Sequence, residues 1–218
     1  MRSLATAFAI AVAMSAGTAL TVPKPAEIPR HWQIDATFGE LLPIQVKLPS
    51  ESLPRTFWYI RYKVTNNTGQ DRVFIPEFIL YTDTGQVIRA GEKVPAEVFH
   101  AIKELYGDPL LLDAASVAGK LLQGADNAKE GVAVWTDFDP QAASFDVFVS
   151  GLSGETMELE LPRPVRTVET DAFGNRIEVV KTKILLAKTL QRHYVVPGEA
   201  STRATMGVKF TDEEWVMR

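Results

Sequence analysis

Few residues of this chain are of the kinds that catalyse reactions or bind metals. Its histidines are His31, His100 and His193, and the sequence contains no cysteine. A zinc site needs several nitrogen or sulfur ligands close together, and no two of these histidines lie within one helical turn. The sequence therefore predicts no metal site and favours a structural or surface role for each histidine.

Acidic side chains form three short clusters, and each has an ordinary structural interpretation. Glu158 and Glu160 alternate with apolar residues, as on the solvent-facing side of a strand. Asp137 and Asp139 lie in a loop that could hold calcium, but the Asp-rich loop typical of calcium sites is missing. The third cluster occupies residues 212–214. We expect no metal and no other cofactor.

A serine-containing turn at 150–155 resembles the turn that carries the nucleophile in many hydrolases. Its spacing differs, because Glu155 stands where G-x-S-x-G requires its second glycine. Strands are expected on both sides of it, whereas the hydrolase turn joins a strand to a helix. The sequence thus predicts a protein without catalytic residues. A hydrolase that uses Asp137, Asp139 or Glu155 stays open as an alternative.

Aromatic residues are the stronger candidates for binding. Trp135 ends an expected strand and Trp215 follows the acidic cluster, so either one is a candidate for exposure. Exposed tryptophans stack on sugars or anchor protein partners. Phe57 and Tyr59 lie on the side of an expected strand that should face solvent, which suggests that a helical segment or a partner covers them. These four are the candidate partner-binding residues.

The elements that would position these residues are mostly β-strands. Over residues 57–65, Trp58, Ile60, Tyr62 and Val64 alternate with the other side chains and share one face. Turn-forming residues occupy 66–71, where Asn66 also begins a glycosylation sequon that its turn role explains equally well. A second apolar run covers 73–82. The pattern predicts a β-hairpin within an antiparallel sheet.

Further strands are expected on both sides of this hairpin. The strand-like segments are 31–38, 44–48, 86–88, 131–135, 145–149, 157–161, 165–169, 177–181, 189–196 and 204–210. A turn at 171–175 joins two of them into a late hairpin. Residues 131–137 also resemble 207–212, but one residue must be skipped to align them. We interpret that similarity as coincidence in preference to a repeat.

A helical pattern interrupts the strands over 95–123. Pro95 fits the first turn of a helix and Gly107 fits its end, while Asp108 and Pro109 suit the start of a second helix that stops at Gly124. The sequence predicts a two-helix insertion at about 95–123. Such an insertion either caps an open end of the sheet, which we prefer, or acts as a functional lid.

The N-terminal residues have the features of a signal peptide. A positive start, an apolar stretch and small residues before Ala19 predict cleavage after residue 19. Residues 20–30 then form a proline-rich extended lead-in, and 31–218 are expected to be one domain. No later segment is long enough to span a membrane. The net charge of −4 is spread without long runs of one sign, which argues against a nucleic-acid partner.

The strand and turn residues resemble a known family. The pattern is Y-x-V-T-N-N at 62–67, F-x-L-x-x-D-x-G at 78–85 and G-V-A-V-W at 131–135. It is similar to the small exported immunoglobulin-like domains of bacteria, among them the secreted mycobacterial immunoprotective antigens. The resemblance covers about 55–150, apart from the helical insertion. It implies a β-sandwich outside the cytoplasm with no established catalytic residues.

The sequence as a whole predicts an all-β dominated, immunoglobulin-like antiparallel β-sandwich with a two-helix insertion. We expect an exported protein, periplasmic or secreted, that is not an enzyme and binds a protein or an envelope component. One alternative is a carbohydrate-binding module that uses Trp135 or Trp215. The other, which we favour less, is the extracytoplasmic hydrolase.

Overall fold

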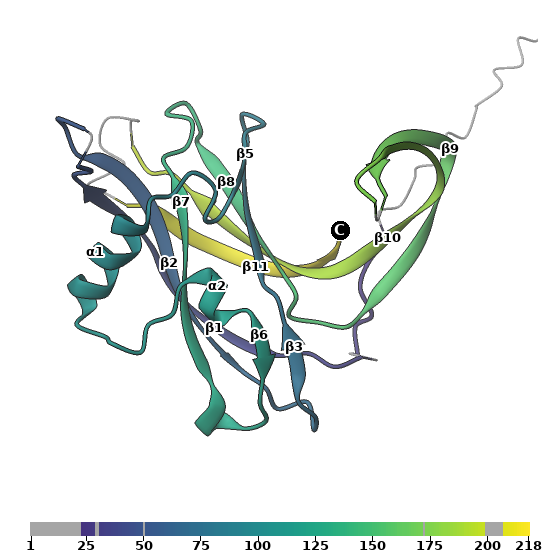
Figure 1. The fold of residues 1–218 in the computed structure, drawn as a ribbon, viewed down its shortest axis with the longest axis horizontal. Helices are drawn as coiled ribbons and strands as arrows, with labels where there is room; N and C mark the ends of the chain where they lie inside the picture. The colour runs from purple at the N-terminus through teal and green to yellow at the C-terminus, as the bar shows by residue number, and fades with distance from the viewer. Residues whose placement is uncertain (1–22, 29–30, 50, 172, 199–206) are drawn as a thin grey trace, which may run out of the picture.

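Two antiparallel β-sheets form the body of the protein (Figure 1). The computed structural model describes residues 23–28, 31–49, 51–171, 173–198 and 207–218. The smaller sheet has the order β1-β2-β7, from Asp35–Val46, Arg55–Thr65 and Lys129–Thr136. The larger sheet has the order β11-β10-β8-β4-β5, from Lys209–Met217, Arg176–Val195, Ser144–Ser150, Glu77–Thr82 and Val87–Arg89. The prediction of an all-β protein with antiparallel sheets is confirmed.

The predicted hairpin between residues 57–65 and 73–82 is wrong. Strand β2 pairs with β1 and β7, whereas β4 belongs to the larger sheet. Pro76 divides the second apolar run, because proline cannot donate to a ladder. The residues before it form the short strand β3 (Arg72–Phe74), and those after it form β4. The turn at 66–71 therefore carries the chain out of the smaller sheet.

The alternation in β2 creates two apolar faces. Trp58, Ile60, Tyr62 and Val64 are buried and pack in one cluster with side chains of the larger sheet, such as Phe78. This confirms that they share the inner face of a strand. The two sheets face each other across this core.

The opposite face of β2 is also buried, which answers the question of what covers Phe57 and Tyr59. Both side chains are at most 2 % exposed and pack with Val98 and Ile102 of helix α1 (Ala96–Tyr106). The prediction that they form a surface for a partner is therefore wrong, because the chain covers them itself. Helix α1 lies along this side of the smaller sheet (Figure 1).

Only the first part of the predicted two-helix insertion at 95–123 has the expected form. Helix α1 ends at Gly107, which has a positive φ of 57° and donates its N–H to the Glu104 carbonyl. The second helix, α2, is only Ala114–Val117. Gly119 has φ 118° and opens strand β6 (Gly119–Leu121), which pairs with β3. The helix has already ended at Val117, since Ala118 is extended with ψ 145°, and the positive φ of Gly119 is not helical either.

The remaining described elements are a 3-10 turn and a long hairpin. The turn, η1, is Ala125–Asn127. Strand β9 (Thr156–Thr170) pairs with residues 176–187 of β10, so each long strand joins two segments that were expected to be separate. Asp171 accepts hydrogen bonds from the N–H groups of Phe173 and Asn175, which closes the predicted turn. We call residues 156–187 the β-arm; Figure 1 shows that it leaves the body on the side away from α1.

Some predictions concern residues outside those described. They are the signal peptide 1–19, part of the lead-in 20–30 and the start of the expected strand 204–210. Residues 23–28 contain no helix or strand. No helix in the described part of the chain is long and apolar enough to cross a membrane.

Asn66 fixes the turn between β2 and β3. Its side chain is fully buried, and its amide nitrogen donates to the carbonyl oxygens of Gln70 (2.8 Å) and Leu121 (2.9 Å). Its amide oxygen accepts from the N–H and the hydroxyl of Thr68. The amide thus joins the turn to β6, which supports a structural role for this residue.

Replacing Asn66 by alanine should destabilise the fold. The Asn66→Ala change removes the donor to the Leu121 carbonyl, a buried hydrogen bond, and the acceptor of the Thr68 N–H, so the free energy of unfolding should fall by about 2 kcal/mol. Urea unfolding measures this value. The matched control is Asn67→Ala, because the Asn67 side chain is exposed. Equal midpoints for the two variants would contradict this role of Asn66.

Candidate functional site

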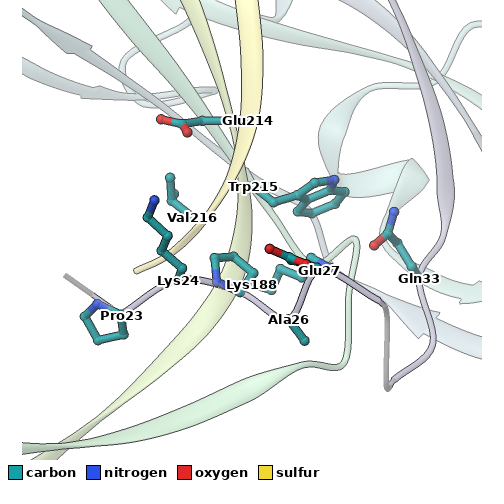
Figure 2. A pocket seen from close by; sticks show the side chains of 10 residues that line it. Pro23, Lys24, Ala26, Glu27, Gln33, Lys188, Glu214, Trp215 and Val216 are labelled. Carbon is teal, nitrogen blue, oxygen red and sulfur yellow. The ribbon is translucent and has the colours of Figure 1, made fainter. Parts of the chain in front are cut away.

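A hollow of about 550 Å³ lies between the N-terminal segment 23–27 and strands β10 and β11 (Figure 2). Trp215 and Glu214 come from β11 and Lys188 from β10, while Gln33 lies just before β1. Trp215 is half-buried, with part of its ring against the core. The hollow therefore combines one aromatic surface with charged and amide groups, a lining typical of ligand pockets.

A buried ion pair forms the floor beside Trp215. The Lys188 side chain is 3 % exposed, and its Nζ lies 3.3 Å from Oε2 of Glu155 and 5.0 Å from the centre of the Trp215 ring. The other oxygen of Glu155 accepts the N–H of Ala26 at 2.8 Å. This hydrogen bond, followed by the effect of Lys188, lowers the pKa of Glu155 below its ordinary value of 4.5. The N-terminal segment is thus tied to the body through a carboxylate.

Gln33 brings an acceptor that the fold leaves unsatisfied. Its Oε1 is buried and accepts no hydrogen bond from the described residues. Buried polar atoms usually have a partner, so an exception deserves an explanation. Less than 1 Å² of this oxygen is accessible, so a ligand in the hollow reaches it only if the side chain turns.

Of the four predicted binding aromatics, only Trp215 lines a cavity. Trp135 is fully buried between the sheets and packs edge-on against Phe78, so the prediction of its exposure is wrong. The alternation along β7 places it on the same inner face as Ala133. A strand end can still lie deep in the core when the opposing sheet extends past it.

Sequence analysis missed Lys188, although a signal was present. Lys188, Leu190, Arg192 and Tyr194 alternate along β10, and all four are buried. Two cations on the inner side of a strand predict that carboxylates lie close to them, because an unpaired charge is costly to bury. Arg192 pairs with Glu213, whose side chain is exposed at the edge of β11.

The carboxylates of the hydrolase alternative all support the fold. Asp137 accepts from Nε1 of Trp58 at 2.8 Å, and Asp139 accepts the N–H of Gln141 at 2.9 Å. Glu155 is held by Lys188 and Ala26 as described. Among the described residues, no three side chains of His, Asp or Glu gather as metal ligands would.

The β-arm is a second candidate surface. Seven of its large apolar residues are exposed, most of all Phe173 at 90 %; the others are Met157, Val165, Val168, Ile177, Val180 and Leu185. In the described structure, β9 pairs only with β10, and the other edge of β10 is bonded only from Ala187 onward, where Ala187 exchanges hydrogen bonds with Arg218 and Lys188 pairs with Met217. Each strand of the β-arm therefore has an unpaired edge. A two-stranded ribbon without a packed face is only marginally stable in water, so this surface suits a partner.

The two candidate surfaces meet at one place. Thr156 pairs with Ala187 at the root of the β-arm, and the next residues along the chain, Glu155 and Lys188, form the buried ion pair. The comparisons with protein-family models, with curated proteins and with solved structures find no match for this chain. Function is therefore inferred from this geometry.

Removing one charge of the buried pair should cost more stability than removing both. Lys188→Met leaves the Glu155 carboxylate buried without its counter-ion, so the free energy of unfolding at pH 7 should fall by about 3 kcal/mol. Glu155→Gln/Lys188→Met should recover most of that loss, because no uncompensated charge remains. Urea unfolding of both variants provides the comparison.

The pH dependence of stability gives an independent check of the pair. Because the pKa of Glu155 is lowered in the folded state, its contribution is present above its ordinary value of 4.5 and is lost as the pH falls through the folded value. The parent protein should therefore lose more stability below about pH 4.5 than the double variant. Parallel stability curves for the two proteins would contradict this assignment.

Proposed function

We propose that this chain is an exported, non-catalytic protein that binds a protein or an envelope component through its β-arm. The single observation that carries the proposal is the exposure of seven large apolar side chains on a ribbon with unpaired edges. Export and a location outside the cytoplasm are supported by the signal-peptide features of residues 1–19. An immunoglobulin-like β-sandwich is supported by the two facing antiparallel sheets.

The form of the β-arm favours a protein partner over a small molecule. Protein partners add strands to exposed sheet edges, where main-chain groups give affinity and alternate side chains give specificity. Val168 and Phe173 lie at the outer part of the β-arm, where such a partner would make contact. No described residue of the β-arm lines the hollow beside Trp215.

Replacing apolar tip residues by aspartate should abolish partner binding and preserve the fold. We expect Val168→Asp/Phe173→Asp to bind at least about tenfold more weakly, because two exposed anchors lose their apolar contacts. The chain without residues 1–19 is used to capture proteins from the envelope of its own host. Each captured protein is then identified, purified and titrated with the parent chain and the variant.

The matched control is Leu105→Asp/Leu110→Asp, which adds the same charges at exposed leucines outside the β-arm. It should bind like the parent chain. Equal binding of all three proteins would remove the β-arm as the binding element.

A saccharide-binding function is the second candidate, and the Trp215 hollow favours it. Sugars stack on tryptophan rings, and the half-buried Trp215 lines the hollow. Of the two tryptophans suggested for this role, Trp135 is buried, so Trp215 is the one that remains as a candidate for stacking on a sugar. The hydrolase alternative draws little support, since Asp137, Asp139 and Glu155 all hold the fold together.

Saccharide binding is tested by removing the aromatic surface. If this candidate is right, glycans retained by the parent chain on an array should bind Trp215→Leu about tenfold or more weakly. Phe210→Leu on the same strand is the matched control, because Phe210 is partly exposed but does not line the hollow. An array without any binding would remove this candidate and leave the β-arm proposal untouched.

A further inference from the structure

We infer that the partner of the β-arm is a second copy of this chain, held in a symmetric dimer. This inference rests on the proposed function, because it takes the β-arm as the binding element and names what it binds. It depends on how charges are divided between the two strands of the β-arm.

The two strands of the β-arm carry opposite net charges. Residues 156–171 contain four acidic and two basic side chains, whereas residues 176–187 contain three basic and one acidic. The first strand is therefore negative by two and the second positive by two, and the β-arm as a whole is neutral. The acidic residues of the first strand are Glu158, Glu160, Glu169 and Asp171, and the basic residues of the second are Arg176, Lys181 and Lys183.

The attraction between these strands is visible within one chain. Lys183 of β10 lies 3.4 Å from Glu158 and 3.7 Å from Glu160 of β9, and Lys181 pairs with Glu169. These side chains are largely exposed, with 52 % of Lys183 and 82 % of Glu160 accessible. Their outer sides can therefore meet further charges of opposite sign.

A twofold axis matches this surface to itself. In an isologous contact, residue i of one copy meets residue j of the other and j meets i. Placing the acidic strand of one β-arm against the basic strand of its partner satisfies both copies at once. The same contact covers exposed apolar residues on the face that carries these charges: Val165 pairs with Lys181, Ile177 with Glu169 and Leu185 with Glu158.

Two prolines favour a closed pair over an open fibre. Pro162 and Pro164 lie in β9, and neither can donate a hydrogen bond to an added strand. Prolines on an edge strand limit its continuous extension from chain to chain. A symmetric contact between two β-arms is complete with two chains, so it does not require edge pairing to repeat from chain to chain.

The test reverses the charge of each strand in turn. Glu158→Lys/Glu160→Lys makes the first strand positive, and Lys181→Glu/Lys183→Glu makes the second strand negative. In either variant, both strands of the β-arm carry the same sign, so its homodimer brings like charges together. In an equal mixture, each strand again meets its opposite in the other chain.

Sedimentation and light scattering of the chains without residues 1–19 measure the outcome. The parent chain should have twice the mass of one chain, and each variant alone should dissociate at least about tenfold more readily. The equal mixture should regain the affinity of the parent within about threefold. Added salt should weaken the parent dimer, because exposed charges are screened.

Two controls separate dimerisation from misfolding and from the broader proposal. Glu97→Lys/Glu104→Lys makes the same change of charge on the exposed side of α1 and should leave the dimer intact. Circular dichroism should show unchanged β-structure in every variant, since exposed ion pairs contribute little to folding.

A parent chain that stays a monomer overturns the inference, as does a mixture of variants that fails to associate. A dimer that both variants retain also overturns it, because its contact would lie elsewhere. A monomer that binds an identified envelope protein through Val168 and Phe173 would contradict the second copy and leave the proposed function standing.

Discussion

Burial of both faces of strand β2 is the constraint on which the rest of this structure depends. Trp58 and Tyr62 require the larger sheet on one side, and Phe57 and Tyr59 require helix α1 on the other. Each large side chain removed from water contributes about 2–3 kcal/mol, so neither cover is dispensable. The smaller sheet consequently becomes a central layer, and its aromatics are no longer available to a ligand. Binding surfaces are left to the periphery of the larger sheet.

One long hairpin connects that periphery to the core. Strands β8 and β9 both pair with β10, and residues 151–155 interrupt what would otherwise be a single strand. Residues 190–195 of β10 lie between β8 and β11 and bury their inner face. Residues 176–187 pair with β9, and no other described sheet packs against that ribbon. The interruption also brings Glu155 beside Lys188, since both lie at the boundary between the covered and the uncovered parts. The hollow and the β-arm thus both depend on the interruption of the strand at residues 151–155.

A protein built in this way separates stability from recognition. The core between the sheets is assembled from alternating apolar residues that exclude solvent, and Asp137, considered above as a catalytic carboxylate, is bonded to Trp58 of that core. The β-arm contributes little to that core, because most of its side chains face solvent on both sides. Such a division agrees with a role in binding, where an exposed element can meet a partner while the body stays rigid.

Local pattern alone determined the class of fold. The period-two alternation around Trp58 and along 145–149 requires half-buried strands, and the turn residues at 171–175 close a hairpin wherever the ribbon goes. Only the tertiary structure decided which strands pair, because alternation fixes the faces of a strand and says nothing of its neighbours. Hence β2 and β4 lie in different sheets, Trp135 is buried, and Gly119 begins a strand where helical spacing suggested a helix. The hollow beside Trp215 joins residues about 190 positions apart, and a contact over that distance depends on the whole arrangement of both sheets.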